Sequence, residues 1–440
     1  MLQSRTLLTL LVAGLIAGAA DAQPPAAELA ALVAQLAADD YLARERAGAA
    51  LLKAGDGAIP DLKDALAKVA DPEARRRLEV VLERLESARL GEPRRVTLKV
   101  ERKPAKEVFA EIAKQTGYKF RLDASPDNAL VTFDWRGTPF LQAVDQLCDV
   151  LQLNANVEDP DGTVQIFDGD QLHPHAAYAG PFRIVATNVN SNRGLQVGGF
   201  SRKNPLARQP DYVNVGVTVS GEPKACLCAL GQATVVRATD ELKNSLLFGD
   251  PESAPGDDPR PAGPNADLPP PAFRNYSTGT SFALNRVARQ ADFVKECRVK
   301  VTAAVLAEAR ADVVVADVAK AAGQKFTGRT YLLEVGATGV QNNAATVGVT
   351  VRRKQVEPDD YNWMNAVQQR VEAYDAEGRL LRANGAIDST QNQALNAVTL
   401  VLTFTKPGAQ KPPKIARLQL VEWVVQYKPI EFTFKDLPLP

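Results

Sequence analysis

The stretch Val215-Gly216-Val217-Thr218-Val219 recurs, letter for letter, as Val347-Gly348-Val349-Thr350-Val351. Valine at every second position places the valine side chains of each stretch on one face of an extended strand. Farther along, Asp240 and Asp375 each open an acidic turn that leads into a pair of leucines. This echo predicts two related β modules in the C-terminal part of the chain.

From Tyr178 onward, short alternating apolar stretches are separated by turn residues, which is typical of antiparallel β-sandwiches. The pattern predicts one sandwich over 177–320 and another over 321–440. Residues 249–272 are rich in Pro, Gly and Asp, so we expect a long loop within the first sandwich. The predicted strands are 182–189, 212–219, 233–238, 298–305, 311–318, 331–335, 346–352, 371–374, 398–404, 418–427 and 430–434.

Residues 95–169 mix helical and strand periodicity. Strands are predicted at 96–100, 118–122, 130–135, near 156 and at 164–167, and helices at 104–115 and 139–151. This βαββαββ order resembles the secretin and TonB short N-terminal domain, which implies a periplasmic docking or signalling module without catalysis. Nothing farther along resembles a secretin ring or a receptor barrel, so a transport role is not implied. The resemblance is carried by Val96-Thr97-Leu98, Phe109 to Gly117, Val131-Thr132-Phe133, Leu141 to Leu151 and Val164-Gln165-Ile166.

Residues 24–91 are rich in Ala, Leu, Glu and Arg, with apolar residues at helical spacing, which predicts two helical hairpins. Asp71-Pro72-Glu73 places an N-cap before a proline at the first helical position and opens the last helix. The run from Asp39-Asp40-Tyr41 through Leu51-Leu52 to Ile59-Pro60 resembles a HEAT repeat, which implies a protein-binding scaffold. A helical cap on the following domain is the alternative.

The segment 1–22 has the features of a cleavable signal peptide. Arg5 precedes an apolar run over 7–20, and Ala20-Asp21-Ala22 is a small-x-small cleavage site. A transmembrane anchor is the alternative, but the run is shorter than the roughly 20 residues that span a bilayer. No cysteine precedes Cys148, so the chain lacks a lipid-attachment cysteine after the cleavage site. We expect an exported protein, periplasmic or secreted, with no membrane span after cleavage.

The charge balance and the four cysteines bear on nucleic-acid binding and on disulfide formation. Lysine plus arginine equal aspartate plus glutamate, 52 against 52, so no net charge favours nucleic acid. Cys148 lies on the apolar face of a predicted helix and is expected in a core. Cys226 and Cys228 lie two apart in a predicted strand, and Cys297 is the natural disulfide partner of one of them. Buried thiols are the alternative.

Side chains for catalysis are scarce. His173 and His175 are the only histidines, and with Asp168 or Asp170 they could hold copper or zinc, but a polar linker between domains explains them better. The chain contains no Gly-x-Ser-x-Gly elbow, no phosphate-binding Gly-x-x-x-x-Gly-Lys and no His-Glu-x-x-His helix. We therefore predict a non-enzymatic protein with no catalytic, cofactor-binding or metal-binding residues.

Acidic pairs and tryptophans are the remaining candidates. Asp257-Asp258 and Asp359-Asp360 lie in turn-rich segments, where solvated loops explain them better than acid–base catalysis. Trp363, within Tyr361 to Met364, is either an interface anchor or a residue that folds back over a sandwich edge, and the second interpretation is favoured. Trp135 and Trp423 lie in predicted strands and are expected in cores.

Together these patterns predict a multidomain α+β protein: helical hairpins, a small βαββαββ domain, then two antiparallel β-sandwich domains. The ending from Ile430 to Pro440, with the helical N-terminal part, resembles exported proteins of planctomycete-type bacteria and implies no particular function. We expect a non-enzymatic envelope protein that binds or scaffolds a protein partner through its N-terminal domains. The alternative is a carbohydrate-binding or hydrolytic β-sandwich protein with its site on loops.

Overall fold

The computed structural model describes residues 25–440 except 125–128, 159–161, 170–172, 193–210, 249–270, 287–289, 356–361, 393–395 and 406–410. It combines helices with several largely antiparallel sheets, which confirms the multidomain α+β class. The chain divides into two compact units, with the boundary between Arg89 and Leu90. The predicted signal peptide, and nearly all of the loop predicted over 249–272, lie outside the described residues.

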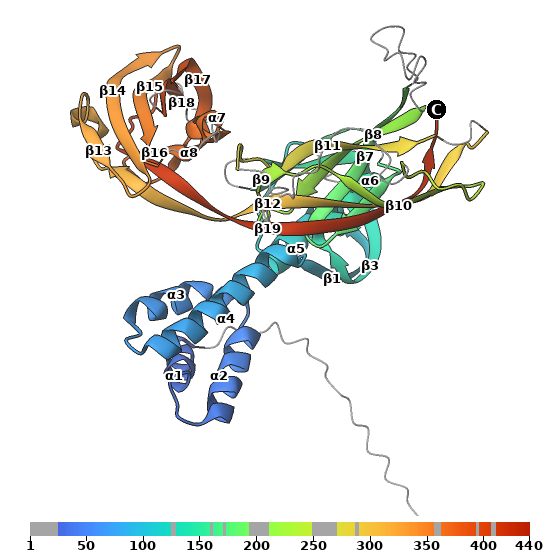
Figure 1. The fold of residues 1–440 in the computed structure, drawn as a ribbon, viewed down its shortest axis with the longest axis horizontal. Coiled ribbons are helices and arrows are strands. Elements are labelled where there is room, and N and C mark those ends of the chain that lie inside the picture. Colours follow the sequence, from blue (N-terminus) through green and yellow to red (C-terminus); the bar gives the residue numbers. More distant parts are fainter. Residues whose placement is uncertain are drawn as a thin grey trace, which may run out of the picture. The chain divides into compact units, whose positions relative to one another are not determined.

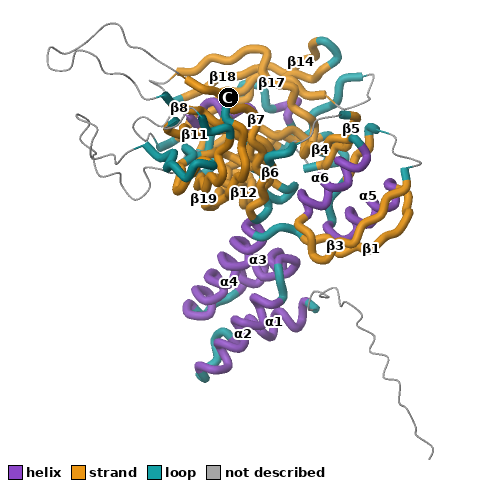
Figure 2. Tube along the Cα trace, turned by 90° about the vertical axis from the view of Figure 1, so that its right-hand side faces the viewer, coloured by secondary structure: helices purple, strands orange, loops and turns teal. Residues whose placement is uncertain are grey.

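The first unit is helical, and we call its described part, residues 25–89, the helical unit (Figure 2). Asp40 caps α2 by accepting a hydrogen bond from the Leu42 amide at 3.1 Å, and Asp71 accepts one from the Ala74 amide at 2.7 Å. The N-terminal signal predicted at Asp71-Pro72 is therefore confirmed. The elements are α1 (Ala26–Gln35), α2 (Tyr41–Lys53), the short η1 (Asp56–Ala58), α3 (Ile59–Lys68) and α4 (Pro72–Gly91).

Residues 95–168 of the second unit form what we call the α/β module, whose element order is the predicted one. β1 pairs antiparallel with β3, while β2, β5 and β4 form a separate sheet in which β2 and β5 run parallel. Phe109 and Phe140 are fully buried in its core. The elements are β1 (Arg95–Pro104), α5 (Ala105–Thr116), β2 (Phe120–Leu122), β3 (Leu130–Pro139), α6 (Phe140–Leu151), β4 (Leu153–Glu158) and β5 (Thr163–Asp168).

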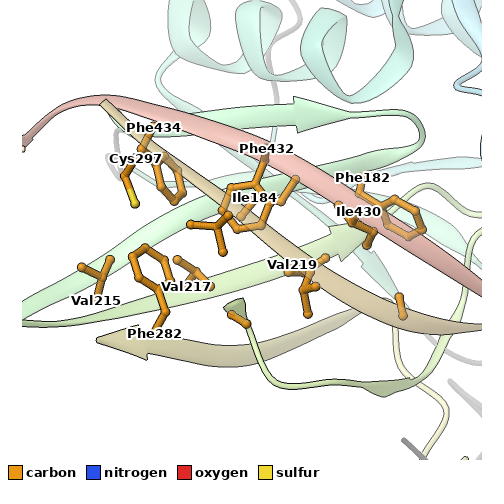
Figure 3. Close-up of a cluster of buried hydrophobic side chains, with 14 of the residues drawn as sticks. Phe182, Ile184, Val215, Val217, Val219, Phe282, Cys297, Ile430, Phe432 and Phe434 are labelled. Atoms are coloured by element: carbon orange, nitrogen blue, oxygen red, sulfur yellow. The ribbon is translucent and has the colours of Figure 1, made fainter. Parts of the chain in front are cut away.

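The first β module packs two sheets around one core (Figure 3). Phe182 and Ile184 of β7, with Val215, Val217 and Val219 of β8, cover one side of the core, because every second residue of these strands points inward. One sheet has the order β11-β8-β7-β6, and the other is one end of a ten-stranded sheet. The elements are β6 (Ala176–Ala179), β7 (Phe182–Asn192), β8 (Tyr212–Gly221), β9 (Leu227–Leu230), β10 (Thr234–Asp240), β11 (Ser277–Asn285) and the first half of β12 (Phe293–Val315).

The second β module is the other end of the same ten-stranded sheet. Its core gathers Val347, Val349 and Val351 of β15 with Leu402 and Phe404 of β18, all at most 1% exposed. The elements are η3 (Val318–Lys320), β13 (Lys325–Thr327), β14 (Tyr331–Gln341), β15 (Ala344–Arg353), α7 (Asn362–Asn365), α8 (Val367–Arg370), β16 (Val371–Tyr374), β17 (Leu380–Asn392), β18 (Ala397–Thr405) and β19 (Arg417–Pro438).

Two long strands, β12 and β19, pair antiparallel along almost their whole lengths and belong to both modules (Figure 1). Val299 and Val301 of β12 pack in the first core and Val313 and Val315 in the second. β19 runs the opposite way, so its last residues pack in the first core. The structure thus differs from the predicted boundary at residue 320: the last strand predicted for the second sandwich lies in the first.

The echo seen in the sequence corresponds to equivalent places in the two modules. β8 lies between β7 and β11, and β15 lies between β14 and β18. The Asp240 carboxylate accepts a hydrogen bond from the amide four residues on at 2.7 Å, and the Asp375 carboxylate does the same at 2.9 Å. Both turns place the intervening third residue in the left-handed region, Lys243 at φ 69° and Gly378 at φ 77°. These correspondences support a duplicated module whose last strand continues into the other copy.

Of the two interpretations of the cysteines, the disulfide is wrong and the buried thiols are confirmed. All four cysteines lie among the described residues, buried and outside any disulfide. Cys297 pairs with Ala238 of β10, and Cys226, Cys228 and Cys297 belong to three different apolar clusters. Leu227, which lies between the first two in sequence, points to the opposite face and joins the Cys297 cluster. Burial raises the pKa of the Cys297 thiol to about 12, which keeps it protonated and unreactive at neutral pH.

Candidate interaction site

The described residues hold no group of three or more His, Cys, Asp or Glu side chains placed to bind a metal ion. Asp168 ends β5, and Asp170 lies outside the described residues. His173 is partly buried beside Arg183, and burial first, then that guanidinium, lowers the pKa of its imidazole. The histidine pair therefore shows no ligand set in the part of the chain that the structure describes.

Trp363 is a core residue. It is 3% exposed, its ring centroid lies 5.7 Å from that of Tyr331, and its indole donates a hydrogen bond to the Asn396 Oδ1 at 3.1 Å. The interpretation that Trp363 folds back into the module is confirmed, and the interface-anchor alternative is wrong. Trp135 and Trp423 are also buried, as predicted. The carboxylate pairs Asp257-Asp258 and Asp359-Asp360 lie outside the described residues.

A buried carboxylate, Glu222, fixes the α/β module to the first β module. Its side chain is fully buried and accepts hydrogen bonds from the Arg94 amide, at 3.2 and 3.1 Å to its two oxygens, and from the Tyr118 hydroxyl at 2.8 Å. Burial raises the pKa of Glu222 to about 7, although these two bonds act to lower it. The turn that holds Glu222 begins at Gly221, where a Cβ would lie 2.1 Å from the Ala225 carbonyl oxygen.

A second polar joint lies at Asp145 of α6. Its carboxylate accepts hydrogen bonds from the Tyr178 hydroxyl of β6, at 2.6 Å, and from the Arg183 guanidinium of β7. Both members of the ion pair are about nine-tenths buried, at 12% and 13% side-chain exposure. Since removing one partner of a buried ion pair leaves the other charge unsatisfied, this joint holds α6 firmly on the sheet.

The two β modules are joined by a third network. The Arg274 amide, just before β11, donates a hydrogen bond to the Gln369 Oε1 at 2.6 Å, and its guanidinium pairs with Glu372 of β16 at 3.4 Å. Glu372 also accepts hydrogen bonds from Tyr374 and Gln419, each at 2.7 Å. Together with the shared strands β12 and β19, this network connects the two β modules within the second unit.

The helical unit contains a groove with a volume of about 420 Å³. Ligand pockets in proteins are typically of this size. α2 and α4 form its walls, because residues three and four apart on each helix share one face. Its apolar lining consists of Leu36, Gly48, Ala49, Leu52, Val80 and Val81, and charged side chains make up the rest of the lining. The charged lining residues are Arg44, Glu45, Glu73, Arg76, Arg77 and Arg84.

Sequence reasoning placed recognition in this region but did not identify the groove. The helical spacing of 24–91 predicted hairpins, whereas the groove depends on a glycine inside α2 and on three arginines of α4. Those arginines, at 76, 77 and 84, were readable in the sequence as one face of a helix. A charged helix face is also what an ordinary solvated helix shows, so the signal alone identifies no site.

Gly48 is not required by the packing of the helical unit. It lies in the interior of α2, and a Cβ added there would meet nothing within 4 Å. Gly48→Ala should therefore raise the free energy of unfolding by about 0.5–1 kcal/mol, because glycine weakens a helix interior by that amount. Slower amide exchange in α2 of the full chain checks this expectation.

Gly55 supplies the control for that experiment. It also has open space at its Cβ but adopts φ 76°, so Gly55→Ala should destabilise the same hairpin. If Gly48→Ala were neutral or destabilising, the glycine would have a structural role that its surroundings do not show.

No protein-family model, curated protein or solved structure matches this chain. Among the described residues, no helix has the length and apolar character needed to cross a membrane.

Proposed function

We propose that this chain is a non-enzymatic, exported envelope protein that binds a partner protein through its N-terminal region, with the β modules as a frame. The observation that carries the proposal is the groove between α2 and α4, which combines a ligand-sized volume with a lining of both apolar and charged side chains. Export rests on the signal-peptide features of residues 1–22.

The rest of the molecule supports the role of a frame. Glu222 and Asp145 mount the α/β module on the first β module through buried hydrogen bonds. The strands β12 and β19 run through both β modules, so neither module can separate without breaking their pairing. These connections hold the parts of the second unit together, as the role of a frame requires.

A pull-down from envelope extract with tagged residues 23–440 tests the proposal. Gly48→Leu adds a bulky side chain to the groove lining at a position where a Cβ meets nothing within 4 Å. Arg46→Leu adds the same side chain to an exposed position of α2 outside the groove and serves as the control. We expect the wild type and Arg46→Leu to recover the same protein, and Gly48→Leu to recover at least about tenfold less, a loss of about 1.4 kcal/mol of binding free energy.

Equal recovery by Gly48→Leu would contradict binding in the groove. Recovery of a polysaccharide by all three proteins would instead favour the carbohydrate-binding alternative, with the site on the β modules.

A further inference from the structure

Gly48 is the first indication of what the groove accommodates. Glycine inside a helix costs about 0.5–1 kcal/mol relative to alanine, and no described residue lies within 4 Å of a Cβ at this position. Gly48 and the neighbouring Ala49 give α2 only small side chains at this part of the groove lining. Small residues let a second backbone approach closely, so this surface of α2 is better suited to contact another helix than to bind a small solute.

The charges that line the groove are not balanced. Arg77 is bound within the groove, since its guanidinium pairs with Glu73 at 2.8 Å and with Glu45 at 3.4 Å. Arg44 donates to the carbonyl oxygens of Ala38 and Asp39, at 2.7 and 2.9 Å, and has no ion pair in the part of the chain that the structure describes.

Arg76 and Arg84 are exposed on the groove face of α4, and neither has an ion pair among the described residues. They lie one turn before and one turn after Val80, which is 42% exposed. Eight residues of α-helix rise about 12 Å, so the backbone positions of the two arginines lie about that far apart along α4, with the exposed valine midway. Carboxylates with an apolar residue between them complement this stripe.

We propose that the groove binds an acidic amphipathic helix of the partner, with an apolar face against Gly48, Ala49 and Val80 and carboxylates against Arg76 and Arg84. This inference rests on the proposed function and names the chemistry of the partner segment. Helix-in-groove recognition uses residues at i, i+3, i+4 and i+7. The expected segment therefore has acidic residues seven or eight positions apart, flanking one or two leucines or valines.

Selection of a displayed library of random 16-residue peptides on the full chain, residues 23–440, tests the inference. We expect enriched peptides to be acidic with apolar residues at helical spacing. Their binding should weaken about tenfold or more in Arg76→Glu/Arg84→Glu and weaken in 0.5 M salt, because charge pairs at the surface are screened. Gly48→Leu should weaken the same peptides without changing any charge.

The control is Arg46→Glu/Lys68→Glu, which makes the same change in net charge at exposed positions outside the groove. Binding by this control should equal that of the wild type. Enrichment of basic or uncharged peptides, no enrichment at all, or equal binding by the wild type and Arg76→Glu/Arg84→Glu would overturn the inference. If the inference alone fails, Gly48→Leu still reduces recovery of the envelope partner about tenfold or more. If the proposed function fails, Gly48→Leu recovers that partner normally.

Discussion

Phe434→Ala is expected to unfold the first β module, although Phe434 lies in the last strand of the chain. Its side chain is 2% exposed, it is paired in register with Cys297, and its ring meets that of Phe432 edge-on at 5.3 Å. Removing a buried phenylalanine costs about 3–5 kcal/mol, through lost transfer free energy and the cavity that remains. Hydrogen exchange resolved by peptide should show lost protection in β8 and retained protection in β15.

Phe404→Ala is the matched control, because Phe404 is fully buried in the second core. It should weaken protection in β15 more than in β8. If Phe434→Ala instead reduced protection in β15 first, the conclusion that the end of β19 belongs to the first core would be contradicted.

Glu222 is expected to make the protein less stable as pH rises. Its pKa is raised from an ordinary value of 4.5 to about 7, so the folded state holds the proton more tightly than the unfolded chain. The free energy of unfolding should therefore fall as pH rises from about 4.5 to about 7 and level off above, by up to about 3 kcal/mol from this group. The groups that face the carboxyl are the Arg94 amide and guanidinium, the Tyr118 hydroxyl and Lys224.

Glu222→Gln keeps an acceptor for the Arg94 amide but cannot ionise. Urea unfolding should be measured at pH 5 and at pH 8. Between these two values the free energy of unfolding should fall more for the wild type than for Glu222→Gln. Glu101→Gln, at an exposed position of β1, should leave the pH dependence of the wild type unchanged. A difference between wild type and Glu222→Gln that stayed constant across this pH range would contradict the burial of an ionisable Glu222.

Much of the secondary structure was predictable because burial and periodicity agree. The strand predicted at 371–374 is β16 to the residue, and both helices of the α/β module lie within one residue of their predicted limits. β12 and β19 were each predicted as two strands. Glu308, Ala309 and Arg310 interrupt the apolar alternation where β12 passes between the two cores, so the periodic signal stops while the strand continues.

Other features required long-range information. β11 was not predicted, because only Phe282 and Leu284 of its nine residues are buried and no clear alternation results. Glu222 lies in a Ser-Gly-Glu-Pro turn, a pattern typical of an exposed loop. Its burial follows from the docking of Tyr118 and Arg94, which are more than a hundred residues away in sequence. Local pattern does not encode such contacts.

The role of the helical unit as the recognition element is tested most directly by hydrogen exchange on residues 23–440 with and without the protein recovered from envelope extract. We predict slowed exchange in peptides from α2 and α4, and unchanged exchange in β8 and β15. Slowed exchange confined to the loops of the β modules, with α2 and α4 unchanged, would contradict it.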